Sequence, residues 1–376
     1  MEHYLDNSAT TRVCPEAAEA AVKAMTEVYG NPASTHTKGR EAAKLLEASR
    51  KKVASALGCT PQELVFTSCG SESDNWAIIN GAEYMKHRGR HIISSAVEHD
   101  AVRKSLDELE SRGFEVTRLM PDSTGAISLE SVKAALRDDT VLVSLMLVNN
   151  ETGAVTDIHA VSEILKGSSS RALLHTDAVQ AFMKVPFKAS TLGADMISIS
   201  GHKIHAPKGI GALYIKKGIN IKPFIVGGGQ ESGRRAGTEA MPQIAAFAAA
   251  CDFAGKGLSK DVEAMRSLKN YAVSALTSAI PELKYIETGA PHILSISMPG
   301  WRSEVLMNYL EAKEIYVSKS SACKKGGRSH VLEAIGLPAD VIDGALRIGI
   351  SRFSTPDDID ALVCGLSEAR KMLSHR

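Results

Sequence analysis

The sequence predicts an α/β protein with a large domain built on a mostly parallel sheet, followed by a smaller α+β domain. Short apolar runs alternate with helical patterns from about residue 64 to residue 215, which is typical of a parallel sheet covered on both faces. Glycine is frequent at 30 residues, whereas aromatic residues make up only 5%. The chain of 376 residues is long enough for one large and one smaller domain.

Two helices are expected before the sheet begins. Pro15 suits the first turn of an alanine-rich helix that runs to about residue 29. Residues 30–32 break it, and a longer helix is expected over residues 34–57. The strands predicted after it are residues 64–67, 91–95, 115–119, 141–148, 172–176, 196–200 and 211–215. The helices predicted between them are residues 72–85, 100–110, 129–136 and 158–165.

The pattern changes after a helix expected over residues 241–253 and the Gly-Lys-Gly run at 255–257. A long helix, short strands at 293–298 and 345–350, and a closing helix from Pro356 follow. We therefore predict a large domain over residues 15–254. The small domain is expected to combine residues 1–14 with residues 255–376.

Bulk composition excludes several classes of function. With 44 basic and 43 acidic residues, the formal charge is +1, so neither nucleic acid nor a membrane surface is expected as a main partner. The first residues do not resemble a signal peptide, and no apolar run reaches the roughly 18 residues of a membrane helix. The six cysteines form no CxxC pair, which argues against disulfides and structural zinc. We expect a cytoplasmic protein without a bound metal.

Polar residues at two neighbouring strand ends predict a cofactor site. Lys203 follows the run 196–199, while Asp177 and Gln180 close the run 171–176. A lone lysine is normally a solvated charge. Ligands in α/β sheets, however, sit beyond the carboxyl ends of the strands. An amine for a Schiff base and a carboxylate for a pyridinium nitrogen are what pyridoxal 5'-phosphate (PLP) requires. Gln180 is expected to contact the ring hydroxyl.

The phosphate of such a cofactor needs small hydrogen-bond donors. Gly70 and Ser71 lie between a predicted strand and a predicted helix, where backbone N–H groups open toward an anion. Ser200 and His202, which flank the lysine, add two donors. The alternative is an ordinary helix cap, because Ser71 would serve as one in any case.

Three further residues are candidates with competing explanations. His99 ends a strand and is expected to stack on the ring and move protons, unless it only caps a helix. Asn150, next to Asn149, is either a turn former or a pocket amide. Arg347 lies in an apolar strand, so its guanidinium needs an anion. The sequence does not decide whether this anion is a substrate carboxylate or the partner in a structural salt bridge.

Cys323 discriminates best between possible reactions. It lies in a polar, glycine-rich stretch with four basic residues within five positions, which favours a thiolate nucleophile over a buried structural thiol. The alternative is an exposed cysteine without a role. Cys69, beside the phosphate loop, is expected to be a small packing residue.

Taken together, these residues resemble the cysteine desulfurases of the NifS/IscS type, within the class V aminotransferases of PLP fold type I. The resemblance extends from Tyr4 to Arg347 and beyond. The matching segments are 4–11, 30–34, 98–99, 149–153, 175–180, 200–203, 207–211, 227–231 and 234–238. Ser71 stands where the family usually has threonine. The stretch after Cys323 looks about two residues shorter than in the best-known members, which leaves the sulfur acceptor open.

The resemblance implies a fold, a chemistry and a set of partners. It implies a seven-stranded, mostly parallel sheet, a Schiff base on Lys203, and a homodimer in which Thr238 of the other subunit joins the phosphate site. It implies that Asn150 and Arg347 bind the substrate, and that L-cysteine becomes L-alanine with a persulfide on Cys323. Sulfur would then pass to an iron–sulfur scaffold or a tRNA-thiolating enzyme. A selenocysteine lyase, a class V aminotransferase and a weakly active regulatory partner remain alternatives.

Overall fold

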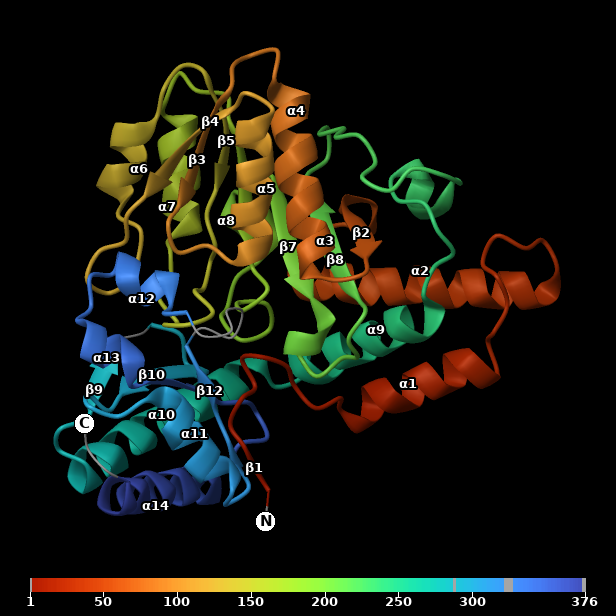
Figure 1. The fold of residues 1–376 in the computed structure, drawn as a ribbon. Coiled ribbons are helices and arrows are strands. Elements are labelled where there is room, and N and C mark those ends of the chain that lie inside the picture. The colour runs from red at the N-terminus through yellow and green to blue at the C-terminus, as the bar shows by residue number, and fades with distance from the viewer. Residues whose placement is uncertain (1, 287–288, 321–326, 374–376) are drawn as a thin grey trace.

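The computed structural model describes residues 2–286, 289–320 and 327–373, and its centre is a seven-stranded sheet (Figure 1). The strand order is β2-β8-β7-β6-β5-β3-β4. Strands β3 to β7 run parallel to one another, while β8 is antiparallel to both β7 and β2. The bounds are β2 Leu64–Thr67, β3 His91–Ser95, β4 Glu115–Leu119, β5 Thr140–Ser144, β6 Leu173–Asp177, β7 Met196–Ser200 and β8 Gly211–Ile215.

Both faces of this sheet are buried, because neighbouring residues of each strand enter different cores. Ile92 packs in one apolar cluster and Ile93 in the other. Helices on the Ile92 side are α4 Gly81–Met85 and α5 Asp100–Ser111. The helix α3 Gly70–Asn75 packs on α5. Helices on the Ile93 side include α2 Thr37–Leu57, α6 Leu129–Ala135, α7 Ile158–Lys166, α8 Ala189–Leu192 and α9 Met241–Gly255. A strand buried on both faces reads as a continuous apolar run, which explains why the sequence identified these strands.

A second, antiparallel sheet lies beyond α9. Its strand order is β12-β13-β10-β9, with bounds β9 Lys284–Ile286, β10 Ile293–Ser297, β12 Ser318–Lys319 and β13 Ala345–Gly349. It shares an apolar core with α10 Leu258–Ala279, α11 Ser303–Glu311 and α14 Pro356–Met372. The short helices α12 His330–Ala334 and α13 Ala339–Asp343 lie between β12 and β13 in the sequence.

The N-terminal residues contact both parts of the chain. Strand β1 (His3–Tyr4) pairs in parallel with β11 (Ile315–Tyr316), and Leu5 is buried in the core of the antiparallel sheet. Cys14 is buried in the core of the large sheet, where α1 (Pro15–Thr26) packs on α9. The domain boundaries at residues 14 and 254 remain a prediction.

The predicted elements are confirmed for the large sheet, with corrections at their ends. The strand expected over 141–148 ends at Ser144, although Leu145 and Leu147 still donate to carbonyls of β6. The helix expected over 72–85 begins at Gly70 and contains a π-helical turn at Trp76–Asn80. The second helix begins at Thr37, after His36 accepts a capping bond from the Gly39 N–H. Beyond residue 255, α11, α12 and α13 were not predicted.

No helix in the described ranges is long and apolar enough to cross a membrane.

Candidate active site

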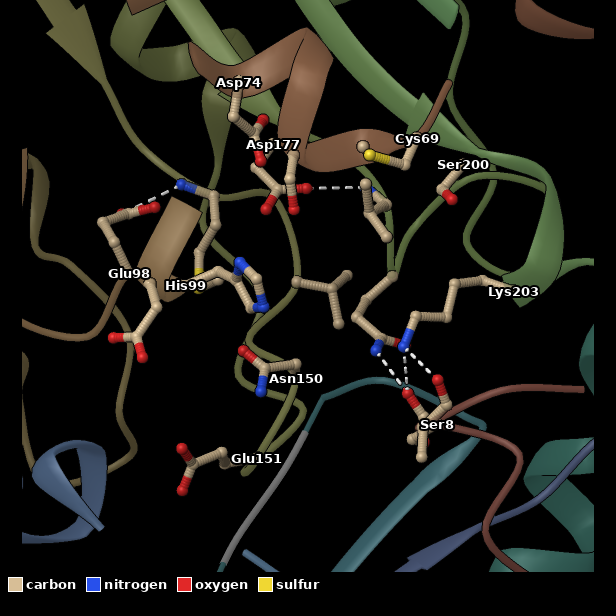
Figure 2. Close-up of a pocket in the computed structure, with 18 of the residues that line it drawn as sticks. Ser8, Cys69, Asp74, Glu98, His99, Asn150, Glu151, Asp177, Ser200 and Lys203 are labelled. Atoms are coloured by element: carbon tan, nitrogen blue, oxygen red, sulfur yellow. Dashed lines mark hydrogen bonds between the residues drawn. The ribbon is translucent and has the colours of Figure 1, made fainter. Parts of the chain in front are cut away.

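A cavity of about 320 Å³ lies at the carboxyl ends of the large-sheet strands. Segments that follow β2, β3, β5, β6 and β7 contribute to it, and the N-terminal segment and β13 close it. Figure 2 shows Lys203, His99 and Asp177 pointing toward this common space. The predicted site residues that line it are Gly70, Ser71, His99, Asn150, Asp177, Gln180, Ser200, His202, Lys203 and Arg347.

Lys203 is held on a tight turn directly after β7. The turn is a single 3₁₀ helix, Gly201–Lys203. A Cβ on Gly201 would lie 2.8 Å from the Ile210 Cγ2 atom, so glycine allows the turn to pack this closely. The Lys203 Nζ donates to the carbonyl oxygens of Ser8 and Ala9, at 2.6 and 2.7 Å. The lysine amine is therefore kept inside the cavity by the N-terminal segment.

The predicted phosphate donors form a small cradle. Gly70 opens the helical segment after β2, and a Cβ there would lie 2.7 Å from Val179 Cγ2. The Ser200 Oγ is buried and has no hydrogen-bond partner within the described residues. A buried hydroxyl without a partner costs free energy, so it points to a ligand atom. Ser71 is exposed at the rim of the cavity.

His202 is a neutral donor beside this cradle. Its Nδ1 lies 3.2 Å from the Thr10 hydroxyl, and its carbonyl accepts from the Thr11 N–H and hydroxyl. Burial, with the charge of Lys203, lowers the pKa of His202 to about 4. The imidazole is therefore uncharged near neutral pH, and any contact with an anion is a hydrogen bond to a neutral ring.

Asp177 is a buried carboxylate in the cavity, and the nearby groups His99 and Lys203 favour its charged form. It is 6% exposed, and its Oδ1 accepts from the Val179 N–H at 2.8 Å. Burial raises the pKa of Asp177, while His99 and Lys203 act to lower it. A cation placed against its other oxygen would be stabilised by this buried charge.

Two further acids line the same wall and were missed. Asp74 and Glu98 are each 1% exposed, and each has one oxygen without a hydrogen-bond partner in the described part of the chain. Burial raises the pKa of Asp74, as does Asp177. Burial raises the pKa of Glu98 to about 8. Glu98 is therefore a neutral acid near pH 7, and burial favours the neutral form of Asp74 as well.

His99 combines the two roles that the sequence left open. Its Nδ1 accepts from the Ala101 N–H at 3.1 Å, so it caps α5. It also lines the cavity, where Figure 2 shows its ring. Because Nδ1 is used as an acceptor, the proton of the neutral ring lies on Nε2. The cap therefore makes Nε2 a donor toward the cavity.

The two adjacent asparagines have different roles. Asn149 is 2% exposed; its Nδ2 donates to the Val97 carbonyl, and its Oδ1 accepts from the N–H groups of Glu151 and Thr152. It shapes the loop and does not line the cavity. Asn150 lines the cavity, and its carbonyl accepts from Arg347.

Arg347 is both a structural residue and a cavity residue. One terminal nitrogen donates to the Asn150 carbonyl at 2.8 Å. The other donates to Ser318 Oγ at 2.8 Å and pairs with Asp6 at 3.2 Å. Its Nε is buried without a partner among the described residues. The salt bridge that the sequence left open is present, and it holds the guanidinium at the cavity wall.

Two predicted residues are not among the described residues that line the cavity. Thr238 is exposed and does not line the cavity. Cys323 lies outside the described residues, in the interval 321–326. The described residues on either side approach the cavity: Ser318 contacts Arg347, and His330 lines the wall with its Nε2 3.2 Å from the Glu98 carbonyl.

Some residues of the wall had only indirect signals in the sequence. Ser8 and Ala9 belong to a segment that carried the family resemblance, but no role followed from it. Glu151 and His330 come from loops, and Glu151 accepts a hydrogen bond from Ser329. Burial raises the pKa of Glu151 to about 7. Local patterns do not report such contacts, because they join residues far apart in the chain.

Comparison with known proteins places this fold in a class. The aminotransferase class-V family profile matches residues 3–362, so the chain belongs to that family. "Cysteine desulfurase 2" of Trichormus variabilis is 42% identical over 365 residues, covering 96% of this chain and 91% of the relative. "Cysteine desulfurase IscS" of Methanosarcina thermophila is 40% identical over 367 residues, covering 96% and 90%.

Solved structures agree with this assignment. A structure described as a "NIFS-like protein" superposes with a TM-score of 0.94 at 38% identity, covering 99% of this chain and all of the other. The chain is thus a member of the cysteine desulfurases of the NifS/IscS type, as its sequence motifs predicted.

Proposed function

We propose that the protein is a PLP-dependent cysteine desulfurase that acts in the cavity around Lys203. It converts L-cysteine to L-alanine and leaves the sulfur as a persulfide on Cys323. The observation that carries the proposal is the convergence of Lys203, Asp177 and the unpartnered Ser200 Oγ on one cavity, in a chain about 40% identical to cysteine desulfurases.

The cavity fits the cofactor on its own chemistry. The Gly70 backbone at the start of a helical segment and the Ser200 hydroxyl suit a phosphate, because both line the cavity and the hydroxyl has no other partner among the described residues. Asp177 offers a buried carboxylate for a protonated ring nitrogen. Lys203 would carry the cofactor, and the remaining contacts would come from Ser71, His99, Asn150, Gln180 and His202, with Thr238 from a second subunit. When bound, PLP supplies an electron sink for the substrate Cα.

The chain's own residues then bind the substrate and move protons. Arg347 holds the substrate carboxylate with Asn150 beside it, because a guanidinium pairs well with a carboxylate. Lys203 and His99 exchange protons at the substrate carbon atoms, and the Nε2 proton of His99 makes this ring a donor. Glu98 is neutral near pH 7 and so does not repel an anionic substrate. Burial disfavours a negative charge on Asp74 as well.

The sulfur transfer balances without an external oxidant. The Cβ–S bond of L-cysteine breaks, and its electron pair stays on carbon. The sulfur forms an S–S bond with the Cys323 thiolate, and the former thiol proton accounts for the new C–H bond of alanine. Before residues 321–326, Ser318 contacts the cavity residue Arg347, and after them His330 lines the cavity. These positions support Cys323 as the acceptor.

Finer properties of the enzyme belong to the same proposal. We infer a cytoplasmic homodimer that passes sulfur to an acceptor protein, such as an iron–sulfur scaffold or a tRNA-thiolating enzyme. Exposed apolar side chains on the loop before Thr238, namely Phe224, Ile225 and Val226, suit contact with a second subunit.

One assay tests the proposal against its alternatives. The protein is incubated with L-cysteine and a reductant, and alanine and sulfide are measured for wild type, Lys203→Ala and Cys323→Ala. We expect both products from wild type, and little of either from Lys203→Ala. Sulfide release unaffected by Cys323→Ala would contradict the persulfide step. Activity with selenocysteine alone would favour the lyase alternative, and a purified protein without cofactor absorbance would refute PLP binding.

A further inference from the structure

A second buried lysine lies behind the cavity, and the mechanism proposed above does not use it. Lys184 is only 7% exposed, although it carries an amine. Its Nζ lies 3.5 Å from the Oε1 atom of Gln180, one helical turn earlier in the chain. Lysine is almost never this buried without a partner or a function.

The Gln180 side chain connects this amine to the pocket lysine. The Nε2 atom of Gln180 donates to the Ser8 carbonyl at 2.8 Å. The same carbonyl accepts from Lys203 Nζ at 2.6 Å. A continuous chain of contacts thus runs from Lys184 through Gln180 and Ser8 to Lys203.

Charge alone does not explain why Lys184 is placed here. Burial keeps the pKa of Lys184 well below its usual range, and Lys203, Arg347 and Arg352 lower it further. These three neighbours are all cationic, so they disfavour an ammonium group at this position. A hydrogen-bond donor is therefore a better explanation for its presence than a fixed positive charge.

We propose that Lys184 is a positioning residue for Lys203. The Lys184 amine holds the Gln180 amide so that its Oε1 faces Lys184 and its Nε2 faces Ser8 and the cavity. This inference rests on the proposed function, because its effect is read on the cofactor-bound Lys203. The positive N–H end of the amide then faces the region of Lys203 and disfavours a proton on the lysine nitrogen. Without Lys184, Oε1 loses its donor, and only the Nε2 bond to the Ser8 carbonyl still orients the amide.

The test follows the absorbance of the cofactor-loaded protein against pH, since that absorbance changes as the Lys203 nitrogen loses its proton. A net hydrogen bond corresponds to a shift of roughly 0.4 to 1 pH unit. We expect Lys184→Met to raise the apparent pKa by up to this amount, because an amide held only through Nε2 disfavours the protonated nitrogen less. Lys184→Gln, which keeps an N–H donor, should lie nearer to wild type. Lys188→Met, an exposed lysine four residues on, is the matched control and should cause no shift.

Several groups besides Lys184 influence this titration, and all of them stay in place in these variants. The charged or titratable groups that interact with Lys203 or line its cavity are Cys69, Asp74, Glu98, His99, Asp100, Glu151, Asp177, His202, His292, His330 and Arg347. Arg352 lowers the pKa of Lys184, and Lys184 lowers the pKa of His205.

A double-mutant cycle separates positioning from direct charge. If Lys184 acts through the amide, Lys184→Met shifts the pKa in wild type but not in a Gln180→Met background. A shift of equal size in both backgrounds, or none in wild type, would overturn the inference and leave the proposed function intact. Wild type without cofactor absorbance would overturn both. Lys184→Leu provides a second apolar variant if Lys184→Met does not fold.

Discussion

Replacing Ser200 with alanine should have opposite effects on the cofactor-free and the cofactor-loaded protein. Ser200 is 1% exposed, and its Oγ has no hydrogen-bond partner within the described residues. Removing it from the cofactor-free protein therefore removes a buried, unpaired polar group, and stability should stay equal or rise by up to about 1 kcal/mol. In the loaded protein, the hydroxyl is expected to donate to a charged phosphate. Such a bond contributes about 1.5–3 kcal/mol, so Ser200→Ala should weaken PLP binding roughly 10- to 150-fold.

Two measurements on the same variants check this sign reversal. PLP affinity is measured by titrating the cofactor-free protein, and stability by its unfolding in urea. Ser94→Ala is the matched control, because the buried Ser94 Oγ donates to the Ser144 carbonyl at 2.8 Å. We expect it to destabilise the protein by about 1 kcal/mol without changing PLP affinity. The reasoning would be refuted if Ser200→Ala behaved like Ser94→Ala in both measurements.

Two other substitutions test the assignments around the cavity. Asn149→Ala should lower the free energy of unfolding by about 2–4 kcal/mol, because it leaves the buried Val97 carbonyl and the N–H groups of Glu151 and Thr152 without their partner. Asn150→Ala should lower it by less than about 1 kcal/mol and mainly raise the KM for L-cysteine. Equal losses of stability in the two variants would contradict these different roles. Glu98→Gln should gain stability relative to wild type as the pH rises from about 4.5 to about 8. In this pH window the folded protein holds the Glu98 proton and the unfolded chain does not, so the free energy of unfolding of wild type falls by on the order of 1 kcal/mol per pH unit, whereas glutamine does not titrate. The measurement is urea unfolding of both proteins at pH 5 and pH 8. The same difference in stability between them at both pH values would exclude the raised pKa.

The sequence predicted the large sheet well because its strands are buried on both faces. Runs such as residues 196–200 and 211–215 are apolar enough to identify strands by themselves, and their observed bounds agree. The small sheet was harder to predict. Strands β11 and β12 contain only two residues each, and their pairing depends on partners far along the chain.

The cavity residues were predictable where they follow a strand, as Asp177 and Lys203 do. Asp74 and Glu98 were missed, because an acid in a helix or loop is normally solvated and only the fold shows that these two are buried. Lys184 was missed for the same reason. The N-terminal segment carried the family resemblance, yet its backbone contacts with Lys203 depend on carbonyl oxygens, which every residue has.

The most direct test of the central claim is the mass of the peptide that contains Cys323 after brief exposure to L-cysteine without reductant. The proposed desulfuration predicts one added sulfur atom on Cys323 in wild type and none in Lys203→Ala. An unmodified Cys323 accompanied by alanine formation, or the extra sulfur on another cysteine such as Cys69 or Cys364, would contradict it.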